Sequence, residues 1–364
     1  MPESFLDRFD VAQKSDRLKM RDLLRNFNKQ VEEAIEIGRK FQLPRSFGGS
    51  FNKILFVGMG GSAIGGDVIR SLVASECGLP IWVSRHYDLP KFVDSKTLCI
   101  FSSYSGNTEE TLAAFEQGRK KGIKALSITS GGELARLSQQ ASLPLIQIPT
   151  GFPPRAALGY SVFPLLQVFS KLKLASWNQT AADETLALLD SLGKKKYSLE
   201  IPSDKNPAKK LAEALFNRLV VIYAGVDLLD SAALRFRNQI EENAKALASH
   251  HLLAEMNHNE ILGWQFPKSL VTKSAACIFL RDVEDHARIQ LRIDFTKNLL
   301  AHERGVLVEE VNSQGKSRLA RLFSVIYLGD WVSYYLALLY RIDPTPVVVI
   351  ESLKKELAGV KLKK

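Results

Sequence analysis

The feature that most constrains the fold is a regular alternation of short apolar runs and helical segments between residues 52 and 149. The apolar runs are KILFVG, PIWVSR, TLCIFSSYS, KALSITSGG and LPLIQIP, and segments such as AIGGDVIRSLVAS and TEETLAAFEQGRKKG separate them. Strands without strict apolar and polar alternation are typical of a parallel sheet that helices cover on both faces. We therefore predict an α/β fold with a doubly wound, flavodoxin-like parallel sheet.

A later region repeats this order. NRLVVIYAGVDLLDSAALRF from Asn217 echoes NKILFVGMGGSAIGGDVIRS from Asn52, and SAACIFLRDVEDHARIQLRIDF echoes KTLCIFSSYSGNTEETLAAF. A chain of 364 residues is also long enough for about two domains. We predict two similar α/β domains, with a helical N-terminal segment at 1–50, a first domain at 51–180, a linker and helix at 181–209, and a second domain at 210–364.

Composition narrows the class of protein. The net charge of +10 includes lysine runs that no aromatic residues interrupt, so we expect no nucleic-acid partner. The three cysteines form no Cys-x-x-Cys pair and the N-terminus has no apolar signal segment, which together predict a cytoplasmic protein. The apolar stretch from Leu322 has Asp330 at its centre, so we predict a buried core helix rather than a membrane span.

The glycine turn GMGGSAIGGD follows the first apolar run and opens a helix. Free N–H groups and the dipole at a helix start favour an anion, most often a phosphate. Gly60 and Gly61 let the backbone approach such a group, and Ser62 adds a hydroxyl. Two alternatives are a turn needed only for packing, and a dinucleotide site in which Arg85 takes the extra phosphate of NADP.

The second loop, SSYSGNTEET, favours the phosphate. Ser103, Ser105 and Thr108 bring three hydroxyls around Gly106. Such hydroxyls with free amides can surround a phosphate monoester, whereas helix capping alone would need just one of them. The second copy has LRDVEDH at this place. We therefore predict that only the first copy binds phosphate.

These loops together resemble the sugar isomerase (SIS) domain family, whose members bind phosphosugars through a serine- and threonine-rich loop. More narrowly, GFPPRAALGY, RNQIEENAK, EMNHNEILGW and DPTPVVVIESLK, in that order, are similar to motifs of the bifunctional phosphoglucose/phosphomannose isomerases. The resemblance covers nearly all of the chain from Asn52. It implies an enzyme that interconverts glucose 6-phosphate, and also mannose 6-phosphate, with fructose 6-phosphate through a cis-enediol, without metal or cofactor.

Glu242 is the residue that the resemblance implies as the proton-transferring base, because it directly precedes Asn-Ala-Lys. The sixteen-residue spacing from Glu242 to His258 agrees with the family. On the residues alone, Glu241 and Glu242 could be a solvated helix face with Lys245 one turn further on. Glu241 is kept as the alternative base in case the register is shifted.

His258 is the residue predicted to open the sugar ring, because a neutral imidazole can shuttle a proton near neutral pH. The resemblance implies that this histidine reaches the active site of a neighbouring subunit, which requires a homodimer. One alternative is a capping or core histidine flanked by Asn257 and Asn259. The other is a metal site, although no standard ligand spacing occurs. Its ligands would be His250, His251, His258, Glu255 and Glu260.

Arg155 is the predicted cation, since a rigid guanidinium after two prolines suits an enediolate or a sugar oxygen. The alternative is an ordinary surface arginine. The resemblance of the C-terminal motif implies that Lys354 hydrogen-bonds sugar hydroxyls and that Thr345 lies near C1 and C2. A non-catalytic phosphosugar sensor and an NADP-dependent oxidoreductase remain as alternative functions.

Overall fold

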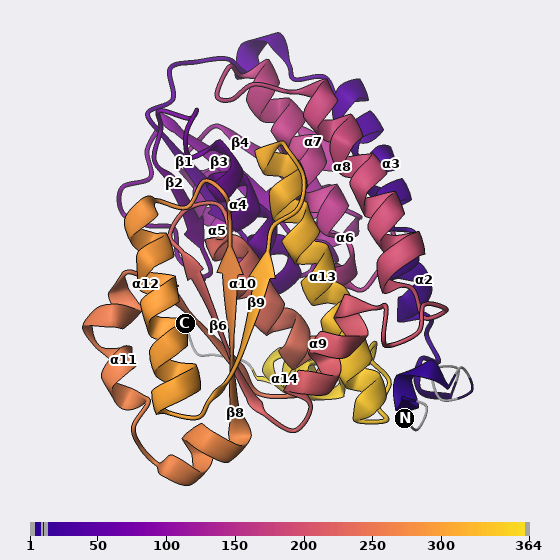
Figure 1. The fold of residues 1–364 in the computed structure, drawn as a ribbon. Helices are drawn as coiled ribbons and strands as arrows, with labels where there is room; N and C mark the ends of the chain where they lie inside the picture. The colour runs from indigo at the N-terminus through magenta and orange to yellow at the C-terminus, as the bar shows by residue number, and fades with distance from the viewer. Residues whose placement is uncertain (1–3, 9, 11–13, 361–364) are drawn as a thin grey trace.

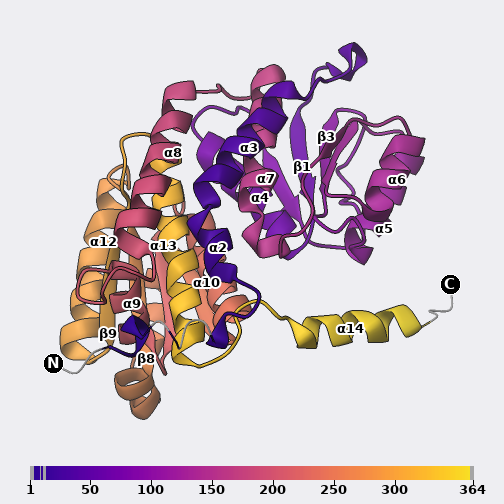
Figure 2. The ribbon, with the colours of Figure 1, turned by 90° about the vertical axis from the view of Figure 1, so that its right-hand side faces the viewer.

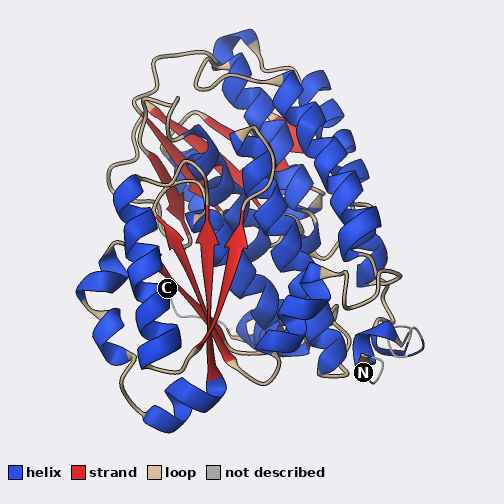
Figure 3. Cartoon of the chain, in the orientation of Figure 1, coloured by secondary structure: helices blue, strands red, loops and turns tan. Residues whose placement is uncertain are grey.

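The computed structural model describes residues 4–8, 10 and 14–360, and these contain two parallel sheets (Figures 1 and 3). The first has the order β2-β1-β3-β4-β5 and the second the order β7-β6-β8-β9, with every neighbouring pair parallel. The prediction of two similar doubly wound sheets is confirmed. The strands are β1 (Lys53–Val57), β2 (Ile81–Ser84), β3 (Thr97–Ser102), β4 (Ala125–Thr129), β5 (Leu145–Gln147), β6 (Leu219–Gly225), β7 (Ala248–Leu253), β8 (Ala275–Arg281) and β9 (Leu307–Asn312).

Helices cover both faces of the first sheet because its strands are apolar on both sides. Phe56 points to the face that α4 (Gly60–Val73) and α7 (Leu158–Lys171) cover, and α3 (Phe27–Lys40) packs outside α7. Leu55 points to the opposite face, under α5 (Glu109–Lys120) and α6 (Gly132–Gln140). Neighbouring strand residues alternate between faces, so each set of apolar side chains builds its own half of the core.

The second sheet has α10 (Asp230–Gln239) and α13 (Arg318–Leu339) on one face and α12 (Ala287–Asn298) on the other. By length and composition α13 could cross a membrane, but 94% of its most apolar stretch is buried inside the protein. The expected core helix is confirmed. α13 packs against α8 (Gln179–Leu192) and α9 (Pro207–Leu215), and one apolar cluster holds side chains from both halves of the chain. The domain boundaries therefore stay a prediction.

The N-terminal segment forms α2 (Met20–Arg25) before α3, as its periodicity predicts. At the other end, α14 (Val348–Gly359) projects away from the rest of the protein (Figure 2). The shorter elements are η1 (Phe5–Asp7), η2 (Arg45–Phe47), η3 (Pro154–Ala156), η4 (Gly193–Tyr197), η5 (Ile240–Ala244), η6 (Glu255–His258), α11 (Glu260–Gly263), η7 (Leu270–Ser274) and η8 (Leu299–Glu303).

Candidate active site

The hydroxyl loop between β3 and α5 gathers the three predicted side chains in one turn. Ser103 Oγ lies 2.8 Å from Thr108 Oγ1 and accepts the Gly106 N–H at 3.1 Å. Ser105 Oγ accepts the Asn107 N–H at 3.2 Å, and the Ser105 side chain is exposed. Gly106 has φ +70°, and a Cβ there would lie 1.8 Å from a backbone oxygen of the next loop. The sharp turn therefore requires glycine.

The glycine turn at the start of α4 lies against this loop. Ser62 Oγ accepts the Tyr104 N–H at 2.9 Å, which joins the two loops at the carboxyl ends of β1 and β3. A Cβ on Gly61 would lie 2.8 Å from Pro154 O and 2.9 Å from Arg155 N. Glycine is required at 61 because the turn that carries Arg155 packs directly on it. The two predicted phosphate loops and the predicted cation are thus neighbours.

Arg155 and Glu242 form the centre of the site. The Arg155 side chain is only 3% exposed, and its Nη1 lies 3.7 Å from Glu242 Oε2. Arg155 Nε donates to Asn243 Oδ1 at 2.6 Å. Burial lowers the pKa of Arg155, and the Glu242 carboxylate opposes this change. Arg155 is therefore a buried cation facing a carboxylate, so the surface-arginine alternative is wrong.

Glu242 and Glu241 have different surroundings although they are adjacent in η5. The Glu242 side chain is 28% exposed, so its carboxylate remains accessible beside Arg155. Glu241 lies 3.5 Å from Arg237 Nε on the preceding turn, which is a solvent-accessible helical pair. Burial raises the pKa of Glu241, and Arg237 opposes the rise. Of the two glutamates, only Glu242 pairs with Arg155 in the described part of the chain.

The segment that precedes α14 is fixed at this centre through its backbone. Arg155 Nη2 donates to Pro344 O and Thr345 O, both at 2.8 Å. Lys245 Nζ donates to Glu242 O at 2.9 Å and to Pro344 O at 2.8 Å. Thr345 therefore lies beside Arg155, whereas Lys354 is exposed on α14 and has no hydrogen bond within the described residues. The expected contacts of both residues with the sugar stay predictions.

A buried polar network, which sequence reasoning missed, supports the centre from α13. Arg235 Nη2 donates to Asp330 Oδ2 at 2.8 Å and to Arg155 O at 2.9 Å. Asn243 Nδ2 donates to Ser333 Oγ at 2.9 Å. Burial raises the pKa of Asp330, and Arg235 opposes the rise. A signal was available, because an aspartate in an apolar core helix needs a buried partner.

His258 makes no contact with Arg155 or Glu242 of its own chain within the described residues. It ends η6, is exposed, and has no hydrogen bond or ion pair among the residues that the structure describes. The other two histidines of the metal alternative, His250 and His251, have different surroundings. His251 Nδ1 lies 2.8 Å from Glu260 Oε2, and burial lowers the pKa of His250 to about 4. Within the described ranges, no group of three or more His, Cys, Asp or Glu side chains is placed to hold a metal ion.

Arg85, the residue on which the dinucleotide alternative depends, is already paired. Its guanidinium forms an ion pair with Asp67 of α4. Burial raises the pKa of Asp67, and the charge of Arg85 opposes the rise. Arg85 therefore neutralises a carboxylate of its own domain, and this contact does not favour an NADP phosphate.

Comparison with known proteins identifies the family of the chain. The family described as "Bacterial phospho-glucose isomerase C-terminal SIS domain" matches residues 204–357. "Bifunctional phosphoglucose/phosphomannose isomerase" of Caldicellulosiruptor bescii is 44% identical over 338 residues, which cover 92% of this chain and 98% of that protein. The protein of the same description from Aquifex aeolicus is 37% identical and covers 84% and 91%. The crystal structure of a glucose-6-phosphate isomerase like protein from Thermus thermophilus has a TM-score of 0.63 at 19% identity and covers 98% and 99%, which shows the fold.

Two parallel sheets, with a glycine turn and a hydroxyl loop at the carboxyl end of the first, define a protein built from sugar isomerase (SIS) domains. Its buried arginine faces a carboxylate from the second half. The chain belongs to the family of the bifunctional phosphoglucose/phosphomannose isomerases.

Proposed function

We propose that this chain is an enzyme that interconverts glucose 6-phosphate, and mannose 6-phosphate, with fructose 6-phosphate. Family membership supports the reaction, and one observation supports its location. The buried Arg155 guanidinium lies 3.7 Å from the accessible Glu242 carboxylate, and the backbone of the turn that carries Arg155 packs on Gly61 of the glycine turn. The substrate phosphate binds at Gly60, Gly61, Ser62, Ser103, Ser105 and Thr108.

The chemistry follows from the pairing of a carboxylate with a cation. Glu242 takes the proton from C2 of the open-chain aldose and returns it to C1, so the hydrogen moves between carbons through a cis-enediol. Negative charge develops on the sugar oxygens during this transfer. Arg155 stabilises that charge, and its fixed hydrogen bonds to Asn243 and Thr345 hold the guanidinium in place without reorganisation.

Ring opening falls to His258 of a neighbouring subunit in a homodimer. This assignment is supported by the exposure of His258 and by its lack of any partner in the described part of its own chain. Thr345 and Lys354 contact the sugar near C1, C2 and its hydroxyls. The enzyme needs no metal or cofactor and works in the cytoplasm, as the sequence predicts.

A coupled assay with fructose 6-phosphate in the presence of EDTA tests the proposal. We expect turnover to both glucose 6-phosphate and mannose 6-phosphate, undiminished by the chelator. A wild-type protein that binds fructose 6-phosphate without turnover would be a sensor instead. Loss of turnover with EDTA would contradict the metal-independent mechanism.

A complementation experiment tests the shared site. Glu242→Gln and His258→Ala variants are each expected to be inactive. After their subunits are mixed and exchanged, hybrid dimers contain one site with both native residues, so we expect about a quarter of wild-type activity. If the mixture stays inactive although hybrids form, His258 does not act in the neighbouring subunit.

A further inference from the structure

The helix α14 has no side chain buried against the rest of the chain, as far as the structure describes it. Every side chain described along it is exposed, including Val349 at 83%, Leu353 at 55% and Leu357 at 46%. With Ile350, these residues form an apolar stripe at helical spacing. Figure 2 shows α14 extending away from both sheets. The stripe therefore faces solvent in a single copy.

The position of α14 is nevertheless fixed at its start. Arg155 and Lys245 hold the backbone of Pro344 and Thr345, three to four residues before the helix begins. A twelve-residue helix without packing is only marginally stable in water. An apolar stripe anchored at one end but otherwise unsupported indicates that another surface covers it.

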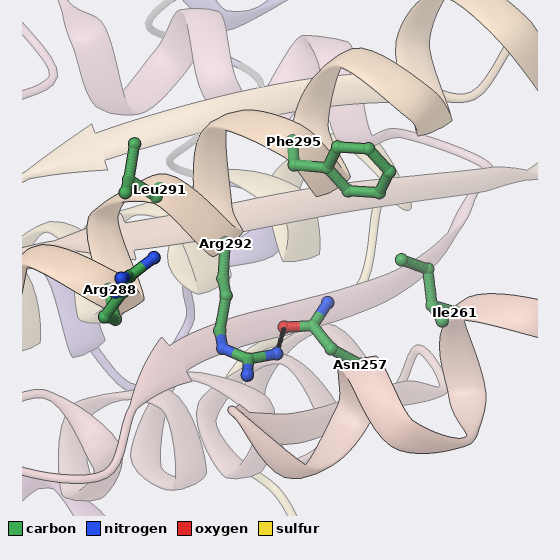
Figure 4. A pocket seen from close by; sticks show the side chains of 6 residues that line it. All are labelled: Asn257, Ile261, Arg288, Leu291, Arg292 and Phe295. Atoms are coloured by element: carbon green, nitrogen blue, oxygen red, sulfur yellow. Dashed lines mark hydrogen bonds between the residues drawn. The ribbon is translucent and has the colours of Figure 1, made fainter.

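A groove beside α12 combines exposed apolar side chains with positive charge, so it could bind an apolar helix face flanked by a carboxylate. It is lined by Asn257, Ile261, Arg288, Leu291, Arg292 and Phe295 (Figure 4). Leu291 is 58% exposed and Phe295 is 64% exposed. The charges in the lining are both positive. Arg292 makes only a 3.5 Å hydrogen bond to Asn257 Oδ1, and the Arg288 side chain has no partner in the described ranges.

The groove and the helix of one copy cannot meet, since α12 and α14 lie on opposite sides of the second sheet (Figure 2). A second copy brings them together. Asn257 and Ile261 of the groove flank His258, which the proposed dimer carries into the neighbour's site. The neighbour's α14 starts from that same site, three residues after its Thr345.

We propose that α14 of each copy docks in the α12 groove of a second copy, in a reciprocal two-fold exchange. The apolar stripe covers Leu291 and Phe295, and Glu356 on one flank of the stripe faces Arg288 and Arg292. Lys354 lies on the opposite flank of the stripe by helical spacing. The proposal rests on the proposed dimer and adds the surface that stabilises it.

Cysteine cross-linking tests this contact. Leu353→Cys and Leu291→Cys are made separately in a Cys77→Ser background, in which the remaining cysteines are buried. We expect a disulfide-linked dimer when the two variants are mixed and oxidised. Leu18→Cys, which replaces a leucine 60% exposed outside the groove, is the matched control and should give no link with Leu353→Cys. Absence of a link in the mixture, or a link within one chain in the double variant, would overturn the proposal.

A charge exchange gives a second readout. Glu356→Arg should raise the dimer dissociation constant roughly tenfold, and Arg292→Glu on the partner should restore it. No change in dissociation would contradict the docked orientation. The outcome is separable from the proposed function. A cross-link without isomerase activity leaves the docking intact, whereas activity and complementation without a cross-link refute the docking alone.

Discussion

The loops after β3 and β8 occupy the same place in the two sheets but use their polar groups differently. In the first, the side chains of Ser103 and Thr108 bond, among the described residues, only to each other and to the local backbone. In the second, Asp282 Oδ2 accepts from Arg321 Nε of α13 at 2.9 Å, and Glu284 pairs with Arg318. A loop can hold a ligand only while the fold does not already use its side chains.

The loops after β1 and β6 differ in the same way. The first is the glycine turn, whereas the second leads to Asp230, which accepts from Arg70 at 2.6 Å and from Ser71 at 2.6 Å on α4 of the first half. The second copy thus joins the two halves of the chain at the place where we propose that the first copy binds phosphate. It supplies instead the carboxylate of Glu242, which follows α10. We therefore expect phosphate to bind to the first copy and the proton transfer to depend on the second.

The largest expected effect tests whether the second copy carries the chemistry. Glu242→Gln should lower kcat by about 10²–10⁴-fold, because the amide cannot accept the C2 proton. Glu241→Gln is the matched control, since Glu241 pairs with Arg237 and should leave kcat within about twofold of wild type. The coupled assay measures both. A larger loss in the Glu241 variant would show that the register is shifted by one residue.

The next largest effect concerns the buried ion pair between Arg235 and Asp330, which holds the backbone of Arg155. Asp330→Asn leaves the Arg235 cation buried without its counterion, so we expect a loss of about 3–5 kcal/mol in the free energy of unfolding, measured with urea. The double variant Asp330→Leu, Arg235→Met should regain much of this stability. Its kcat should remain low, because nothing then holds the Arg155 carbonyl. Full activity in the stable double variant would show that the network has no positioning role.

A smaller effect compares the two loops directly. Thr108→Val removes one hydroxyl donor to a charged phosphate, worth about 1.5–3 kcal/mol, so kcat/KM should fall roughly ten- to hundredfold with little change in stability. Asp282→Asn should do the opposite, lowering the free energy of unfolding while leaving kcat/KM nearly unchanged. The comparison between the copies fails if the Asp282 variant loses kcat/KM as strongly as the Thr108 variant.

The sequence predicted what depends on local pattern. Apolar runs predicted the strands, and the hydroxyls around Gly106 do lie together in one turn, whereas their binding of phosphate stays a prediction. The sequence could not predict that Arg155 is buried, because the partners of Arg155, Pro344 and Thr345, are about 190 residues away in the chain. The exposure of α14 and the lack of contacts of His258 with Arg155 and Glu242 likewise depend on tertiary packing, which no local spacing encodes.

The smallest expected effect concerns Lys245, which joins the Glu242 turn to the segment before α14. Its Nζ donates to the carbonyl oxygens of Glu242, Asn243, Asp343 and Pro344. Burial, aided by the charge of Arg155, lowers the pKa of Lys245 to about 8. In the unfolded chain the pKa is about 10.4, so between these values the unfolded state binds more protons and the stability of the fold rises with pH.

Lys245→Met should therefore flatten the pH dependence of the unfolding free energy between about pH 8 and 10, with little difference in slope below pH 8. The change should be modest, because the Lys245 side chain is exposed and water screens its charge. Urea unfolding at several pH values measures the slope, and Lys120→Met, on the exposed surface of α5, is the control. Equal slopes in the two variants would show that the four carbonyl contacts of Lys245 do not change its protonation on folding, and would contradict the prediction.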